Sequence, residues 1–397
     1  MMIAQIRRAY RNNTALTFCP SRVKLRPFTP ALSRESAYLC EKPAKDIMRT
    51  VFWDYETNEF KMIDQRRLPA AFELLAYRDY HAVAGAITSM VVRGAPAIGA
   101  AAGFGLALAA QQSRAGTVEE LMADLEEASA VLKAARPTAV NLAWALERIL
   151  GSLSKAGGEG SSLDDLRQAV LAEAQRIADE DVAINKRMGE HGATLIEDGD
   201  TIIHHCNTGA LATVDWGTAL GVIRAAWEQG KRIHVLVDET RPRLQGARLT
   251  AWELEQYGIP YEIITDNMAG HFLRRGEAQK CFVGSDRTAA NGDVANKIGT
   301  YMLALAAFDN GVPFYPVVPT STIDLSMAHG GLIPIEERDP AEVLGLQFEG
   351  ERVSPAGAHA RNIAFDVTPA RLVTAIVTEN GIVYPPFETN LRKAVEG

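Results

Sequence analysis

The chain has 397 residues, which is enough for two domains with well-filled cores. Hydrophobic residues make up 47% of it and charged residues 23%, as in ordinary globular proteins. The net charge of -8 disfavours a broad nucleic-acid-binding surface, and no apolar run approaches the roughly 20 residues of a membrane helix. We therefore expect neither nucleic acid nor a membrane as a partner.

The cysteine pattern indicates a reducing compartment, and we expect a cytoplasmic protein. None of the four cysteines forms a CxxC pair, so neither a structural zinc site nor a disulfide scaffold is favoured. Cys281 lies in an apolar run and is expected in the core. His204 and His205 are adjacent and would point to opposite faces of a strand, so we expect no metal site there.

Residues 1–47 differ from the rest of the chain. Up to Arg34 they contain seven Lys or Arg and no acidic residue. This composition resembles an organelle transit peptide, but without a long apolar segment it does not fit a secretory signal. We favour a disordered extension upstream of a natural start near Met48.

Residues 48–175 are expected to form a small, mostly helical N-terminal domain with a short β-sheet. Strands are predicted at 51–53 and 59–63, and helices from about 80 to 153. Arg93 and Arg136 each stand shortly before a proline at a predicted helix start. Such an arginine either binds an anion at the helix N-terminus or forms a salt bridge, and the sequence leaves both open.

The domain boundary is predicted between 160 and 190 and placed at 175/176. Residues 157–162 are rich in Gly and Ser and resemble a linker, whereas 163–192 read as a long connecting helix. Residues 176–397 then form the second domain.

This second domain alternates apolar runs with helical segments. Strands are predicted at 201–205, 233–237, 261–264, 280–283 and 314–318. This pattern predicts an α/β fold with a parallel sheet covered by helices on both faces. The last long helix is predicted from Asn291 to Asn310, with Val294, Ile298, Met302, Leu305 and Phe308 on one stripe and Gly311 ending it.

Polar residues follow each predicted strand, and in a parallel sheet these ends lie on one edge. Cys206 follows the first strand and could act as nucleophile, base or proton carrier. Asp286 follows the fourth and could be a general acid or base, a helix cap or a partner of Arg287. We therefore predict a site with a thiol and a carboxylate.

The same edge favours a small phosphorylated ligand. Asn296 and Lys297 are predicted at the start of the long helix, where a phosphate could bind, and Gln245 opens another helix. The sequence has neither a Walker loop nor a Rossmann glycine fingerprint, so no nucleotide cofactor is indicated.

Eight motifs resemble those of the methylthioribose-1-phosphate isomerase family, which is related to the regulatory subunits of translation initiation factor 2B and to archaeal ribose-1,5-bisphosphate isomerase. The resemblance covers about residues 50 to 388. The motifs are Arg93–Gly99, Arg136–Leu142, His205–Thr213, Asp238–Arg248, Gly284–Arg287, Asn296–Gly299, Ile333–Arg338 and Ala364–Pro369.

The resemblance implies a Rossmann-like C-terminal domain, a homodimer, no cofactor and an aldose–ketose isomerase of methionine salvage. It implies that Cys206 and Asp286 are catalytic and that the substrate-binding residues are Arg93, Gly94, Ala95, Arg136, Gln245, Asn296 and Lys297. Two alternatives stay open. One is an isomerase of 5-deoxyribose 1-phosphate or ribose 1,5-bisphosphate, and the other is a non-catalytic regulatory subunit.

Overall fold

The computed structural model describes residues 49–397 except residue 138 and residues 157–161. The predictions for residues 1–47 and for most of the linker-like stretch lie outside these residues. The described part begins with a three-stranded antiparallel sheet of β1 (Val51–Asp54), β2 (Glu59–Ile63) and β3 (Leu74–Tyr77). The first two strands confirm the prediction, whereas β3 was not anticipated.

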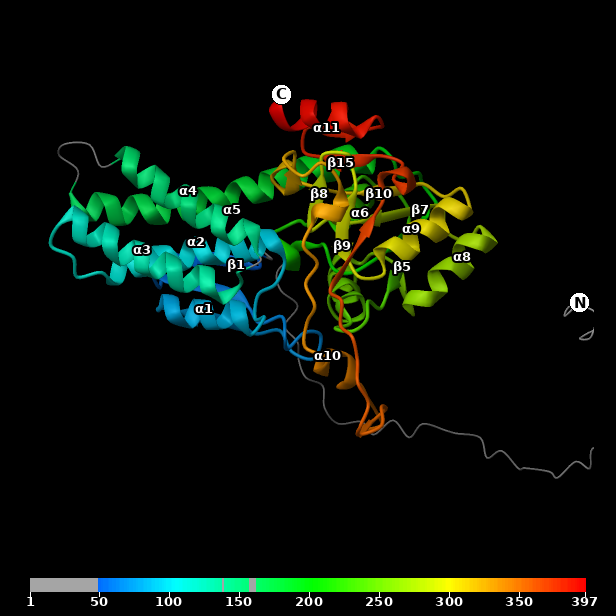
Figure 1. Cartoon of the computed structure of the whole chain (residues 1–397), viewed down its shortest axis with the longest axis horizontal. Helices are drawn as coiled ribbons and strands as arrows, with labels where there is room; N and C mark the ends of the chain where they lie inside the picture. Colours follow the sequence, from blue (N-terminus) through cyan, green and yellow to red (C-terminus); the bar gives the residue numbers. More distant parts are fainter. Residues whose placement is uncertain (1–48, 138, 157–161) are drawn as a thin grey trace, which may run out of the picture. The chain divides into compact units, whose positions relative to one another are not determined.

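Helix α2 (Ala95–Gln112) is the centre of the N-terminal half, and it packs against helices on several sides (Figure 1). Every residue from Ala97 to Ala110 is buried, as its small apolar sequence predicted. A Cβ on Gly105 would lie 3.1 Å from Leu132 Cδ2, so glycine permits this close packing. The surrounding helices are α1 (Tyr80–Thr88), α3 (Val118–Ala135), α4 (Val140–Ala156) and α5 (Leu163–Ala193).

Helix α5 belongs to two hydrophobic cores. Leu166, Val170 and Ile177 in its first half pack in the helical core around α2. Met188 and Ala193 at its end pack in a second core, against the sheet that follows. The boundary placed at 175/176 therefore falls inside one continuous helix, and the division into two domains stays a prediction.

The second half is built on a five-stranded parallel sheet in the order β10-β7-β4-β5-β6. The chain starts at the central strand β4, extends to one edge through β5 and β6, and then returns to β7 and β10 on the other side. This order is that of a Rossmann-like sheet, and it confirms the predicted fold class. The strands are β4 (Thr201–His204), β5 (His234–Asp238), β6 (Tyr261–Ile264), β7 (Lys280–Val283) and β10 (Phe314–Pro316).

Both faces of the central strands are buried, because alternate residues of these strands enter different cores. Ile203 and Cys281 face one core, and Ile202 and Phe282 face the other. The burial of Cys281 confirms its predicted place. The first core lies against α8 (Ala269–Arg275), α9 (Thr300–Asp309) and α11 (Phe387–Glu396), and the second against α5, α6 (Ala219–Glu228) and α7 (Ala251–Tyr257).

The prediction of a helix from Asn291 to Asn310 is wrong up to Gly299, because helix α9 begins at Thr300. Val294–Lys297 is strand β9, which pairs on one side with β8 (Arg287–Ala289) and on the other with β14 (Phe365–Thr368). The strand β11 (Ile323–Asp324) completes this small mixed sheet. Pairing with a strand about 70 residues later in the chain decides the conformation here, and local sequence does not reveal such a partner.

The apolar stripe predicted for this helix is also wrong. Helix α9 begins at Thr300, and Met302 and Phe308 are 61% and 60% exposed. Its buried residues are instead Thr300, Leu303, Ala304 and Ala307.

The remaining elements are α10 (Ala341–Leu344), the hairpin β12 (Gln347–Phe348) with β13 (Glu351–Arg352), and the hairpin β15 (Ile376–Thr378) with β16 (Gly381–Val383). Among the described residues, no helix is long and apolar enough to span a membrane.

The contact between α5 and α6 allows a test of the packing. A Cβ on Gly192 in α5 would lie 2.4 Å from Val222 Cγ2 in α6. We expect Gly192→Ala to lower the free energy of unfolding by about 1–3 kcal/mol, because the two helices must move apart. The matched control is Gly151→Ala in α4, where no atom lies within 4 Å of the new Cβ, and it should gain about 0.5–1 kcal/mol. Urea midpoints measure both, and equal midpoints for the two variants would contradict this account of the interface.

Candidate active site

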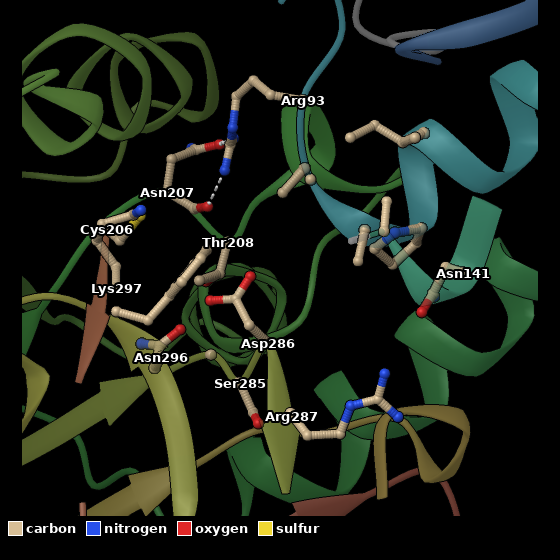
Figure 2. Close-up of a pocket in the computed structure, with 18 of the residues that line it drawn as sticks. Arg93, Asn141, Cys206, Asn207, Thr208, Ser285, Asp286, Arg287, Asn296 and Lys297 are labelled. Atoms are coloured by element: carbon tan, nitrogen blue, oxygen red, sulfur yellow. Dashed lines mark hydrogen bonds between the residues drawn. The ribbon is translucent and has the colours of Figure 1, made fainter. Parts of the chain in front are cut away.

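A cavity of about 640 Å³ lies where the carboxyl ends of β4 and β7 meet the starts of α2 and α4. Every site residue named from the sequence lines it, and Figure 2 shows Cys206, Asp286, Asn296, Lys297 and Arg93 around the same space. Residues from both halves of the chain thus form its walls. Their individual roles remain predictions, but their assembly in one cavity is a feature of the fold.

Cys206 is held in a strained backbone conformation directly after β4. Its φ is +69°, in the left-handed region that costs a non-glycine residue about 1–3 kcal/mol. Two threonines hold it there: the Cys206 N–H donates to Thr240 Oγ1 at 2.9 Å, and the Thr250 hydroxyl donates to the Cys206 carbonyl at 2.7 Å. The side chain is 5% exposed, at the wall of the cavity.

Asn207 connects this turn to Arg93. The Arg93 guanidinium donates to both Asn207 Oδ1 and the Asn207 carbonyl, the latter at 2.8 Å (Figure 2). The Asn207 amide donates in turn to Glu253 Oε1 at 2.8 Å. The orientation of Arg93 therefore depends on a buried acid in α7 that it does not touch directly.

Glu253 is fully buried and binds the loop that follows Cys206. Its Oε2 accepts the Ala210 N–H at 2.7 Å and the Tyr257 hydroxyl at 3.3 Å, and its Oε1 accepts the Leu211 N–H at 3.3 Å. Sequence reasoning missed this residue. The signal that could have found it is an acid placed between the apolar residues Trp252 and Leu254.

Asp286 follows β7, and its backbone N–H donates to the Ala295 carbonyl at 2.9 Å. Neither structural alternative for its side chain is observed, because a strand and not a helix follows it, and Arg287 pairs with Asp324 at 3.8 Å. Its carboxylate points into the cavity (Figure 2). Burial raises the pKa of the Asp286 carboxyl group, although the positive charges of Lys297 and Arg93 oppose this increase.

Burial also raises the pKa of the Cys206 thiol, against the opposing charges of Arg93 and Lys297. The negative charge of Asp286 adds to the increase. A thiol with a raised pKa keeps its proton at neutral pH.

Asn296 and Lys297 lie on strand β9, so their predicted place at a helix start is wrong. Both still line the cavity. The Lys297 ammonium donates to the Ala364 carbonyl at 2.9 Å and lies 4.2 Å from the centre of the Phe365 ring. The Asn296 amide donates to Thr300 Oγ1 at 3.0 Å. Burial lowers the pKa of Lys297, while Cys206 and Asp286 oppose that shift.

Most of the cations in the cavity wall are already neutralised or bound by the protein itself. Arg248 donates to three backbone carbonyls, at 3.0 Å for Arg66 and Leu68 and 3.3 Å for Gln65. Four further arginines each lie near a carboxylate: Arg66 near Asp64 at 2.7 Å, Arg243 near Glu342 at 2.7 Å, Arg287 near Asp324 at 3.8 Å and Arg338 near Glu336 at 3.3 Å.

Four cavity cations have no carboxylate within ion-pair distance among the described residues, namely Arg93, Arg136, Lys297 and Arg248, and the last of these is bound to three backbone carbonyls. The salt-bridge alternative for Arg93 and Arg136 is therefore not observed there. Burial lowers the pKa of both guanidinium groups, which costs free energy that a bound anion would offset. The electrostatics of the cavity thus favour one anionic group.

The remaining predicted residues complete this wall. Gly94 has a φ of +98°, and a Cβ there would lie 2.1 Å from the Ala212 carbonyl oxygen, so only glycine fits before the first residue of α2, Ala95. Gln245 is 8% exposed, and its Oε1 has no hydrogen-bond partner among the described residues. A buried amide oxygen without a partner is suited to accept a hydrogen bond from a ligand hydroxyl.

The cavity also has an extensive apolar lining, which the sequence did not locate. Its members are Met90, Ile98, Val140, Leu249, Met327, Ile333, Ile335 and Phe365. Several polar lining residues were not singled out from the sequence, although all of them lie within the motifs quoted above: Asn207, Arg243, Ser285, Glu336 and Arg338. A ligand with one anionic end and one apolar group would match this lining.

Comparison with known proteins places this geometry in a family. Residues 91–385 match the model of the initiation factor 2 subunit family, which covers more than half of the chain. The chain belongs to the initiation factor 2 subunit family.

Within that family the chain stands among isomerases. It is 52% identical over 349 residues to the methylthioribose-1-phosphate isomerase of Thermosipho africanus, with 88% of this chain and 99% of that one covered. The crystal structure of 5-methylthioribose 1-phosphate isomerase from Pyrococcus horikoshii OT3 matches with a TM-score of 0.83 and 47% identity, covering 88% and 96% of the two chains.

A structure described as translation initiation factor eIF-2B, subunit delta, from A. fulgidus matches almost as well. Its TM-score is 0.80 and its identity 43%, with 88% of this chain and 100% of that one covered. Similarity of the fold therefore does not separate an enzyme from a regulatory subunit, and the cavity residues must do so.

The raised pKa of Cys206 predicts a pH-dependent reactivity. We expect iodoacetamide to modify Cys206 slowly at pH 7 and faster as the pH rises, because only the thiolate attacks. Cys281 is fully buried and should stay unmodified until the protein unfolds. Peptide mass spectrometry distinguishes the two thiols. Modification of Cys206 at neutral pH as fast as that of an ordinary free thiol would contradict the predicted protonation state.

Proposed function

We propose that the protein converts 5-methylthioribose 1-phosphate to 5-methylthioribulose 1-phosphate, a step of methionine salvage. The observation that carries the proposal is the cavity that brings Cys206 and Asp286 together with Arg93, Arg136 and Lys297, which have no carboxylate partner among the described residues. The isomerase relatives named above support the same reaction. Cys206 and Asp286 are the proposed catalytic residues, and the scheme below needs no cofactor.

The substrate sets the chemical requirement for an acid. Its anomeric carbon carries the phosphate, so the sugar cannot open to a free aldehyde. The ring oxygen must gain a proton as its bond to C1 breaks. Asp286 is the proposed donor, and its raised pKa supports this role because it increases the protonated fraction at neutral pH.

Hydrogen must then move from C2 to C1. A base can remove a proton from C2 to give a phosphoenolate, or the hydrogen can shift as hydride. Cys206 would be the base in the first route and would shape the water-poor pocket in the second. The raised pKa of its thiol favours the second route, because a protonated thiol is a poor base. Rapid alkylation of Cys206 at neutral pH would instead favour the first.

The cations favour a sugar with a single phosphate. Arg93, Arg136 and Lys297 are the proposed phosphate ligands, and Gln245 and Asn296 are the proposed partners of sugar hydroxyls. The second phosphate of ribose 1,5-bisphosphate would need further cations, but the other arginines are engaged by carboxylates or carbonyls. The apolar lining suits a methylthio group and would accept the methyl group of 5-deoxyribose 1-phosphate as well.

A regulatory role without catalysis is less well supported. A binding module has no need of a thiol and a carboxylate in one cavity, and strain at Cys206 is typical of functional sites. We further propose a homodimer in a reducing compartment, the cytoplasm. Cys206 and Cys281 are both free thiols, in keeping with that location.

The proposed function is tested by offering the three sugar phosphates separately and measuring ketose formation. We expect the highest kcat/KM with 5-methylthioribose 1-phosphate and the lowest with ribose 1,5-bisphosphate. Cys206→Ser and Asp286→Asn should each lower turnover by at least about 10²-fold, on the scale of lost acid–base catalysis. Circular dichroism controls for folding.

The pH profile provides a further check on Asp286. Activity should be retained below its pKa in the enzyme–substrate complex and fall as the pH rises through that value, because the acid must be protonated. A near-normal rate in Cys206→Ser or in Asp286→Asn would remove the substituted residue from its proposed role. Absence of turnover with all three sugars would favour the regulatory alternative.

A comparison of two arginines tests the assignment of the phosphate ligands. Arg136 has no carboxylate partner among the described residues, whereas Arg287 lines the same cavity and lies 3.8 Å from Asp324. We expect Arg136→Ala to raise KM by about 10-fold or more, the scale of a lost charge-assisted hydrogen bond. Arg287→Ala should raise it less. Steady-state kinetics measures both, and a larger effect of Arg287→Ala would refute the assignment.

A further inference from the structure

His205 directly precedes Cys206, and both nitrogens of its ring face oxygen acceptors. Nδ1 lies 2.9 Å from Asp238 Oδ2, and Nε2 lies 2.9 Å from the Ile298 carbonyl oxygen. The ring is 1% exposed and does not line the cavity. The contacts of the His205 ring therefore connect the residue before Cys206 with Ile298, the residue after Lys297.

These two partners determine how many protons the pair must hold. A carbonyl oxygen can only accept, so Nε2 must carry a proton. If Nδ1 carried none, its lone pair would face the carboxylate of Asp238, and the two would repel each other. The contact is favourable only with a further proton between Nδ1 and Asp238, so the pair is an imidazolium with a carboxylate or the equivalent tautomer.

His204, the adjacent residue, shows the opposite environment. Its Nδ1 lies 2.9 Å from the Phe282 carbonyl oxygen, but its Nε2 lies 3.3 Å from the Thr208 hydroxyl, which can donate. A neutral ring satisfies both contacts. Burial lowers the pKa of His204 to about 4, with His205 adding to the decrease. The two neighbouring histidines at the end of β4 thus lie in different hydrogen-bonding environments.

The charges around His205 support this assignment. Burial alone would lower the pKa of His205, but the hydrogen bond and charge of Asp238, with Asp266 beyond it, outweigh burial and raise it. Burial raises the pKa of Asp238 to about 6, against the bond to His205. The other titratable groups that act on this pair are His204, Glu239, Cys281 and Asp366.

We propose that His205 is an imidazolium at neutral pH and that its buried ion pair with Asp238 is a positioning element, which sets the placement of Cys206 relative to Lys297. Gly299 supports the arrangement, since a Cβ there would lie 2.8 Å from His205 Cε1. Asp366 fixes the same junction by accepting the N–H groups of Gly299 and Tyr301 at 2.8 and 3.0 Å. The kinetic consequence rests on the proposed function, but the charge of the ring does not.

Nuclear magnetic resonance of protein with ¹⁵N-labelled histidine tests the charge directly on the unaltered chain. At pH 7 the His205 ring should show two protonated nitrogens, and the His204 ring one. The variants His205→Gln and His204→Gln assign the signals. A neutral His205 ring at pH 7 would overturn the proposal whether or not the protein is an isomerase.

The variant Asp238→Asn separates charge from hydrogen bonding. Its amide can donate to Nδ1 of a neutral His205, and Nε2 still donates to Ile298, so both hydrogen bonds persist. We expect the His205 ring to carry one proton fewer. We also expect kcat to fall by up to about 10-fold and KM to change far less, as when a catalytic group is displaced. Glu262→Gln is the matched control, because it alters the exposed pair with His234 at the other end of β5, 3.3 Å apart.

Full kcat in a folded Asp238→Asn protein whose His205 ring has lost its proton would overturn the positioning role.

A second outcome would overturn the ion pair itself. His205, Asp238 and Asp266 offer ligand atoms within 4.8 Å of one another, so a metal ion is the competing explanation. A stoichiometric metal that disappears in Asp238→Asn would establish it. The geometry favours the proton, because Asp266 already accepts the N–H groups of Thr240 and Arg241, both at 2.7 Å.

Discussion

The buried carboxylate of Glu253 is the constraint on which the rest of the cavity depends. A carboxylate without water is tolerated only when donors surround it, and here they come from Asn207, Ala210, Leu211 and Tyr257. Because three of these donors, Asn207, Ala210 and Leu211, lie in the loop after β4, satisfying the acid also folds the loop. The orientation of Arg93 follows from it through Asn207, so a helix residue outside the cavity arranges a group inside it.

Much of this arrangement could be predicted from local sequence. Apolar runs identified the five parallel strands, and parallel strands bring their carboxyl ends to one edge of a sheet whatever the loops do. Cys206 and Asp286 follow β4 and β7, which are neighbours, so their convergence follows from the strand order. The burial of Ala97–Ala110 followed from composition, since a helix of small apolar residues has no face to offer to water.

The failures share a physical cause, which is dependence on residues distant in the chain. Val294–Lys297 becomes a strand because β14 pairs with it, and the residues themselves favour neither state. Whether an arginine of the cavity has a carboxylate partner depends on acids such as Glu342, which lies about 100 residues after Arg243. Glu253 gains its importance from a loop more than 40 residues earlier. Such pairings are decided by the fold, so a single sequence does not reveal them.

Helix α5 has a mechanical consequence for ligand binding. Its 31 residues are anchored in the helical core at one end and in the sheet core at the other. Arg93 and Arg136 belong to the first of these bodies, and Cys206 and Asp286 to the second. A hinge between them would have to bend a continuous helix that is packed at both ends. The two walls are thus fixed at a set separation before any ligand arrives, and little of the binding free energy is spent on bringing them together.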